Sequence, residues 1–94
     1  MINIHISSEK IIMKGHAGQS VNGQDIVCAA ISALTCNLIN SLERLTDTHI
    51  RTEIDSGKII IEWKHLDDKG RILLDSWFMG VTVINQEYNC ITFV

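Results

Sequence analysis

Residues 25–45, DIVCAAISALTCNLINSLERL, set the architecture of this chain. Apolar residues recur along the stretch at steps of three and four, the spacing that places side chains on one face of an α-helix. This face consists of Val27, Ile31, Leu34, Leu38, Leu42 and Leu45. We therefore expect a long amphipathic helix from about Asp25 to Leu45, with this face turned toward the core.

Two short strands are expected before this helix. Residues 2–7 alternate apolar and polar side chains, and residues 10–14 form an apolar extended run, which together predict a β-hairpin. Gly15 ends the second strand and opens a segment that runs to Gly23. Glycines at positions 15, 18 and 23 disfavour regular structure in that segment and permit close backbone approach or movement.

After the long helix, the sequence pattern again predicts strands. Residues 48–54 and 58–64 read as two strands, and Asp55-Ser56-Gly57 between them is a strong hairpin signal. Asp67 or Asp68 can cap a second helix over residues 69–85. Its inward positions are Leu74, Trp77, Phe78, Val81 and Ile84. Residues 88–94 are short and apolar and predict a final strand.

The expected order of elements is ββαββαβ. A mostly antiparallel sheet with two helices packed on one face is an α+β two-layer domain. The chain has 94 residues, which suits a single domain over residues 1–94 with one modest core.

Composition excludes several classes of function. A formal charge of -3 gives no basic field for phosphates, so we expect no direct contact with nucleic acid. The N-terminus lacks the pattern of a signal peptide, and no apolar run approaches the ~20 residues that cross a bilayer. The 3 cysteines show no CxxC spacing and the 4 histidines are scattered, which argues against disulfides and a metal site. We expect a cytoplasmic protein with no metal and no cofactor.

Cys28 is the residue most able to act as a nucleophile. A thiol acts as a nucleophile in its thiolate form, and a free cysteine with a pKa of ~8.5 is mostly protonated at neutral pH. A helix N-terminus favours the anion, and Cys28 is expected in the opening turn of the long helix. The unpaired N–H groups of that turn could also stabilise an oxyanion on a carbonyl that Cys28 attacks.

Three further side chains could complete a site around Cys28. His16 lies at the start of the glycine-rich segment, which could fold it over the thiol as general base and acid. Asp25 and Ser32 fall three residues before and four after Cys28, on the same helix face. Asp25 could cap the helix or orient His16. Ser32 could bond within the site or to a backbone carbonyl one turn back.

Each of these residues also has a purely structural interpretation. A cysteine among Val27, Ala29 and Ala30 is commonly a small buried apolar residue. Asp25 is more often a cap than a catalytic acid. Cys36 and Cys90 stand in apolar surroundings and are expected in the core. From the residues alone, a catalytic pair is open but not compelling.

A resemblance narrows these alternatives. The residues Gly15-His16-Ala17, followed by Gly23-Gln24-Asp25-Ile26-Val27-Cys28-Ala29-Ala30-Ile31-Ser32, closely resemble the signature of the Prp family of ribosomal-processing cysteine proteases. The resemblance implies Cys28 as nucleophile, His16 as base and acid, Asp25 as the acidic residue and Ser32 as a supporting hydroxyl. It also implies that the glycine-rich segment covers the substrate, which makes Gly15, Ala17, Gly18 and Gly23 the expected binding residues.

The resemblance implies a substrate as well. Family members remove a short N-terminal extension from a protein of the bacterial large ribosomal subunit, and they form homodimers. We therefore expect this chain to be a cysteine endopeptidase acting on such a precursor. Two other functions remain alternatives: a non-catalytic ribosome-assembly or protein-interaction module, and a thiol redox sensor that uses Cys28.

Overall fold

The structure of this chain is a computed structural model that describes residues 1–15 and 24–94, with side chains of the first helix from Ile26 onward. The described elements follow the expected order ββαββαβ. They are β1 (Ile2–Ile6), β2 (Lys10–Gly15), α1 (Gln24–Leu45), β3 (Ile50–Asp55), β4 (Lys58–Trp63), α2 (Asp68–Tyr88) and β5 (Ile91–Phe93).

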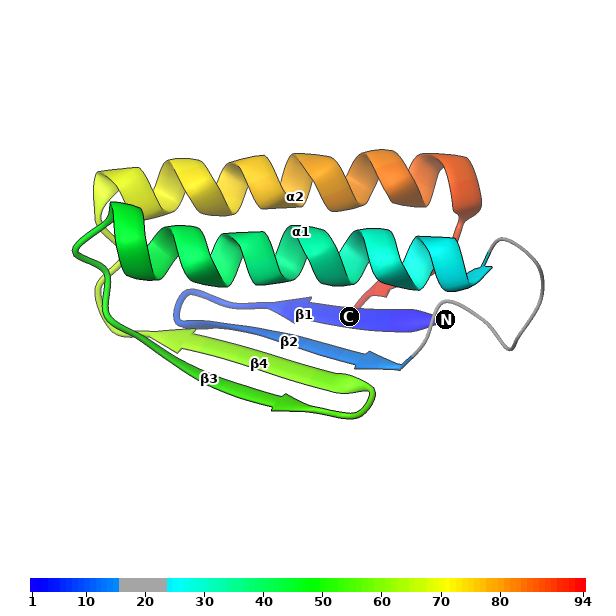
Figure 1. Cartoon of the computed structure of the whole chain (residues 1–94), viewed down its shortest axis with the longest axis horizontal. Coiled ribbons are helices and arrows are strands. Elements are labelled where there is room, and N and C mark those ends of the chain that lie inside the picture. Colours follow the sequence, from blue (N-terminus) through cyan, green and yellow to red (C-terminus); the bar gives the residue numbers. More distant parts are fainter. Residues whose placement is uncertain (16–23) are drawn as a thin grey trace.

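The strands of the described residues form one sheet in the order β3-β4-β2-β1-β5. Neighbouring strands are antiparallel except β1 and β5, which are parallel. Both helices lie side by side on one face of this sheet (Figure 1). The predicted α+β two-layer fold is confirmed.

One row of side chains across the sheet shows where the helices lie. Ile54, Ile59, Met13, Ile4 and Phe93 are successive cross-strand partners from β3 to β5. Met13 and Ile4 in the middle are 7% and 0% exposed, whereas Ile54 and Phe93 at the two ends are 62% and 41% exposed. The helical layer therefore covers the centre of the sheet, and exposure along this row is largest at Ile54 on the β3 edge.

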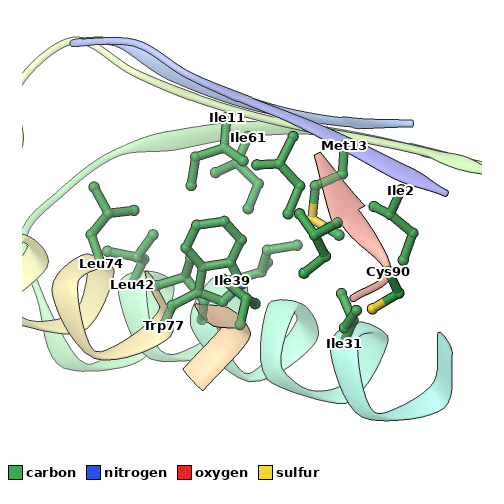
Figure 2. Close-up of a cluster of buried hydrophobic side chains, with 14 of the residues drawn as sticks. Ile2, Ile11, Met13, Ile31, Ile39, Leu42, Ile61, Leu74, Trp77 and Cys90 are labelled. Atoms are coloured by element: carbon green, nitrogen blue, oxygen red, sulfur yellow. The ribbon is translucent and has the colours of Figure 1, made fainter. Parts of the chain in front are cut away.

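The core is formed between this sheet and the two helices (Figure 2). At its centre the hydroxyl of Thr35, which is 0% exposed, links three elements. It accepts a hydrogen bond from Trp77 Nε1 on α2 at 3.1 Å and donates to the Ile31 carbonyl within α1 at 2.8 Å. The sulfur of Met13 on β2 lies 3.5 Å away. This polar contact fixes α1 against α2 and the sheet, because a buried hydroxyl without partners would be costly.

Helix α1 buries the predicted stripe, with two corrections. Leu45, expected on the inward face, is 63% exposed because it is the last residue of the helix and projects beyond the sheet-covered part. Cys36, expected in the core, is exposed. It follows the buried Thr35 by one residue, a rotation of about 100° that takes it away from the sheet.

The length and composition of α1 correct a further expectation. From Ile26 to Leu45 the helix is, by length and composition, long and apolar enough to cross a membrane. The sequence analysis expected no apolar run of that length. The buried face of the helix packs on the sheet as the core helix of the domain, and core helices of soluble proteins pass the same test.

Helix α2 has a side-chain cap at its start and a left-handed residue at its end. Asp67 accepts a hydrogen bond from the Gly70 N–H, as predicted for one of the two aspartates. The helix continues to Tyr88, three residues beyond the expected end, and stops where Asn89 adopts φ 49°. Phe78, expected to point inward, is 41% exposed and packs on the Phe93 ring of β5, with centroids 5.5 Å apart.

Candidate functional site

Cys28 lies one turn inside the N-terminal end of α1. The helix begins at Gln24, so Cys28 is its fifth residue and follows the opening turn rather than belonging to it. The unpaired N–H groups of a helix start belong to residues before this position. In an α-helix the Cα–Cβ bond tilts toward the N-terminus, which directs the thiol back toward those groups. Cys28 therefore lies next to the helix N-terminus, close to its expected place in the opening turn, and its activation as a thiolate stays a prediction.

The surroundings of Cys28 are part apolar and part open. The side chain is half-buried and packs against the hydrophobic core. Ser32, one turn further along α1, is exposed, and Ile26 before it is 68% exposed. Cys28 is thus neither sealed in the core nor fully in water. A partly accessible thiol at this position is compatible with attack on a peptide, which a fully buried thiol would not permit.

A second thiol lies close to the first. Cys90, just before β5, is 5% exposed, and Figure 2 shows it beside the turn of α1 that carries Ile31. Burial raises the pKa of the Cys90 thiol, and the nearby Cys28 raises it further. Cys90 is therefore an inert neutral thiol at physiological pH, and its predicted place in the core is confirmed.

Several predicted site residues lie outside the described residues. They are His16, Ala17, Gly18 and Gly23. Asp25 lies within α1 by its backbone, and its side chain is also outside the description. The pairing of His16 with Cys28, and the choice between capping and orienting roles for Asp25, stay predictions.

Gly15 shows why the segment before α1 begins with glycine. Its φ of +99° is a conformation that other residues rarely adopt, and a Cβ there would lie 2.5 Å from the Met1 carbonyl oxygen. Its N–H donates a hydrogen bond of 2.9 Å to the Gly57 carbonyl in the β3–β4 turn. The end of β2, the β3–β4 turn and the start of α1 lie at the same end of the molecule (Figure 1). Gly15 thus anchors the chain near Cys28.

One cavity, lined by described residues, lies away from Cys28. This cavity has a volume of about 760 Å³ and lies between the β1–β2 turn and the α1–β3 connection. Ser8, Asp47 and Trp63 are among the residues that line it. Cys28 is separated from this cavity by most of α1, roughly 25 Å at 1.5 Å per residue. The indole Nε1 of Trp63 donates to the Ser8 carbonyl at 2.9 Å, which fixes this wall. The cavity is therefore not where the thiol acts.

The sequence analysis missed one feature of the Cys28 end. Ile54 and Ile59 are cross-strand partners on the helix side of the sheet, and Ile54 is 62% exposed. The signal was present in the sequence, since Ile50, Thr52 and Ile54 alternate with charged residues along β3. What the sequence did not show was that Ile54, on the edge strand β3, is left exposed.

Comparisons with known proteins identify the family of this chain. The sequence profile of the family described as cysteine protease Prp matches residues 1–91. The ribosomal processing cysteine protease Prp of Staphylococcus aureus strain Mu50 is 29% identical over 82 residues, which cover 84% of this chain and 77% of that protein.

Two crystal structures of an essential ribosomal processing protease Prp from S. aureus share the fold. The complex with a covalently linked product peptide matches with a TM-score of 0.83 and 27% identity, and the match covers 98% of this chain and 94% of that one. The complex with a substrate peptide matches with a TM-score of 0.85 and 26% identity over 99% and 95%. The expected fold and enzyme class are confirmed, and this chain belongs to the cysteine protease Prp family.

Proposed function

We propose that this protein is a cytoplasmic cysteine endopeptidase that removes the N-terminal extension of a bacterial large-subunit ribosomal protein, with Cys28 as nucleophile and His16 as its partner. The observation that carries the proposal is the half-buried Cys28 one turn inside α1, in a chain that belongs to a cysteine protease family. The S. aureus relative is named a ribosomal processing protease, which supports the same class of substrate here.

The chemistry follows from the position of the thiol. His16 takes the thiol proton, and the Cys28 sulfur attacks the scissile carbonyl carbon to form a tetrahedral oxyanion. The N–H groups at the start of α1 stabilise that oxyanion, since the positive end of the helix dipole lies there. As the oxyanion collapses, the C–N bond breaks, His16 gives its proton to the leaving amine, and the acyl group stays on Cys28 as a thioester. Water, activated by His16, hydrolyses the thioester and restores the thiol.

The remaining predicted residues have supporting roles in this proposal. Asp25 either caps α1 or orients the His16 imidazole, and Ser32 supports the site from the next turn. The segment that contains Gly15, Ala17, Gly18 and Gly23 binds the peptide, and its glycines permit close backbone approach. No residue of this site calls for a metal or a cofactor in the reaction.

We also propose that the protein acts as a homodimer. Ile72, Met79 and Val83 on α2 are 67%, 66% and 63% exposed, and their steps of seven and four place them on one helix face. A chain of this size gains stability when a second copy covers such a face. Sedimentation analysis of the wild type and of Met79→Glu tests this. A dimer that the charge dissociates supports the proposal, and a wild-type monomer at micromolar concentration contradicts it.

The function is tested by cleavage of the ribosomal protein precursor. We expect the wild type to cut its N-terminal extension, and Cys28→Ala and His16→Ala to lower kcat/KM by about 1,000-fold or more. Cys36→Ala is the matched control because Cys36 is an exposed thiol on the same helix. It should cleave as the wild type does. Precursor that the wild type binds tightly and leaves uncut would replace the proposal with a binding module.

A further inference from the structure

A buried thiol that the proposed mechanism does not use lies close to Cys28. Cys90 is 5% exposed and belongs to the hydrophobic core, and the half-buried Cys28 packs against that same core. Figure 2 shows the Cys90 side chain beside the turn of α1 that carries Ile31. Ile31 follows Cys28 by three residues, which places the two side chains one above the other on the helix. The proposed nucleophile therefore has a second sulfur as a neighbour.

The backbone of Cys90 is held on both sides. Its carbonyl accepts a hydrogen bond from the Ile2 N–H at 2.8 Å, and the Ile91 N–H donates to Asn85 Oδ1 at 2.8 Å. The chain passes from the end of α2 at Tyr88 to the start of β5 in two residues, and thus from the helical layer to the sheet. Cys90 stands between these layers, at the end of the molecule where α1 begins (Figure 1).

The electrostatics of the two thiols agrees with this placement. Burial raises the pKa of the Cys90 thiol, and the neighbouring Cys28 raises it further, because a thiolate on one sulfur repels a thiolate on the other. The more accessible Cys28 therefore carries the negative charge, and Cys90 keeps its proton. Burial also shields Cys90 from reagents in the solvent, so an oxidant reaches Cys28 first.

We propose that Cys28 and Cys90 form a reversible disulfide when the enzyme meets hydrogen peroxide, and that this bond switches the protease off. The inference rests on the proposed function, because the sulfur consumed by the bond is the proposed nucleophile. Cys28 reacts with the oxidant, and Cys90 is the resolving thiol. A redox-sensing thiol is often placed beside a resolving one, and disulfides of cytosolic proteins are commonly transient ones of this kind.

The chemistry takes place in two steps. The Cys28 thiolate attacks one peroxide oxygen, the O–O bond breaks and hydroxide leaves, so the sulfur is oxidised by two electrons to a sulfenic acid. The Cys90 sulfur then attacks the Cys28 sulfur, the S–O bond breaks, and the Cys90 proton leaves with the hydroxyl group as water. Proximity compensates for the weak acidity of Cys90 in this step. A dithiol reverses the bond by two thiol–disulfide exchanges and leaves as its own disulfide.

The resolving thiol also protects the nucleophile. A sulfenic acid that meets a second peroxide becomes a sulfinic acid, which a dithiol does not reduce. Formation of the disulfide removes the sulfenic acid before this happens. The presence of Cys90 should therefore decide whether the loss of activity under peroxide is reversible.

The test uses Cys36→Ala, in which Cys28 and Cys90 are the two remaining cysteines. Trypsin places them in separate peptides, residues 15–44 and 72–94. After a sustained excess of hydrogen peroxide and alkylation of the unfolded protein, mass spectrometry without reductant should find these peptides joined within a monomer. Cleavage of the ribosomal protein precursor should fall about tenfold or more and return after dithiothreitol.

The double variant Cys36→Ala/Cys90→Ala is the comparison. Before oxidation it should cleave the precursor as Cys36→Ala does, since Cys90 has no part in peptide hydrolysis. After the same peroxide treatment its Cys28 should be a sulfinic acid, and dithiothreitol should restore little activity.

Two results would overturn the proposal. One is Cys36→Ala protein in which peroxide converts Cys28 to a sulfinic acid while Cys90 stays an alkylatable thiol. The other is a double variant that dithiothreitol restores as fully as Cys36→Ala. The first result does not depend on the folding of a Cys90 variant. If the reduced Cys36→Ala protein and the reduced wild type both leave the precursor uncut, the proposed function fails, and the joined peptides still decide whether the bond forms.

Discussion

The two helices begin in opposite ways. At the start of α2 the Asp67 carboxylate is surrounded by donors: Oδ1 accepts from the Gly70 N–H at 2.7 Å and from the Thr48 hydroxyl at 3.0 Å, and Oδ2 accepts from the Asp47 N–H at 2.9 Å. At the start of α1, Gly23 precedes Gln24 in the sequence, and the capping role of Asp25 stays a prediction.

This contrast separates two uses of the same physical property. A helix N-terminus favours negative charge, whether that charge is a structural carboxylate or a reacting group. In α2 the Asp67 carboxylate accepts a hydrogen bond from the Gly70 N–H and ties the helix to the α1–β3 connection. In α1 the residue inside the end is Cys28, and the proposed anions are its thiolate and the oxyanion of the substrate. The start of α2 serves stability, and the start of α1 is the proposed place for chemistry.

The largest effect on the capped end is expected from Gly70→Ala. A Cβ at Gly70 would lie 2.7 Å from the Thr48 Oγ1, 2.9 Å from a Leu66 methyl and 3.0 Å from the Asp67 Oδ1. Three close contacts in a hydrogen-bonded corner force the cap to open. We expect the free energy of unfolding to fall by about 2 kcal/mol, measured by urea denaturation.

Gly80→Ala is the control for that substitution. Its Cβ would approach the end of the Leu34 side chain, at 3.1 Å, which can move. Alanine also has the higher helix propensity by about 1 kcal/mol, so the stability should change by less than 1 kcal/mol. Equal losses in the two variants would show that helix packing, and not the Asp67 corner, limits stability. Catalysis per folded molecule should be unchanged in both.

The next effect concerns the reactive end. We expect Cys28 to react with iodoacetamide at pH 7 about tenfold faster than Cys36, because the thiolate is the reacting species and a helix N-terminus favours it. Cys36 is exposed on the same helix but two turns further on. Cys90 should react slowest, since burial raises its pKa and hides it. Mass spectrometry of the three cysteine peptides against time measures the rates.

The two outcomes of this labelling are distinct. If His16→Ala lowers the ratio of the Cys28 rate to the Cys36 rate, the imidazole activates the thiol, as the proposed pair requires. Equal rates for Cys28 and Cys36 in the wild type would contradict an activated thiol. The two helix starts would then differ in structure, but the start of α1 would not activate a thiol.

Local patterns in the sequence predicted most of the fold. The Asp55-Ser56-Gly57 turn, the start of α2 at Asp67 and the buried stripe of α1 each depend on neighbouring residues, and each is confirmed. Gly57, for example, adopts φ 73°, which the turn requires. Such features follow from backbone sterics and from periodicity, which one sequence displays.

The features that were wrong depend on distant contacts. Phe78 has the spacing of an inward residue, yet β5 lies beneath it and Phe93 offers a ring at the sheet edge. Cys36 has apolar neighbours, but only a knowledge of where α1 crosses the sheet shows that it points outward. The structure starts α1 at Gln24, one residue before the expected start, so Cys28 lies close to its expected place on the helix. In the site, position along the helix was thus predictable, and the exposure of Ile54 at the β3 edge was not.

The smallest expected effect is the pH dependence of the capped end. Hydrogen bonds from Gly70, above all, lower the pKa of Asp67 in the folded protein, with Asp47 and Thr48 adding to the effect. A carboxylate whose folded pKa lies below the unfolded value stabilises the fold above the unfolded pKa, about 4. Its contribution is lost as the pH falls further, through the folded pKa. Asp67→Asn should therefore lower Tm at pH 7 by roughly 3–6 °C.

The same variant should approach the wild type in acid. Once Asp67 is protonated, its side chain carries no charge and resembles asparagine in shape, so the gap in Tm should narrow steadily between about pH 5 and pH 2. Thermal unfolding followed by circular dichroism across this range measures the gap. A gap that stays constant with pH would mean that the cap acts through its hydrogen bonds alone. In that case the negative charge of Asp67 would not stabilise the start of α2. The comparison of the two helix starts as sites that favour an anion would then lose its support from α2.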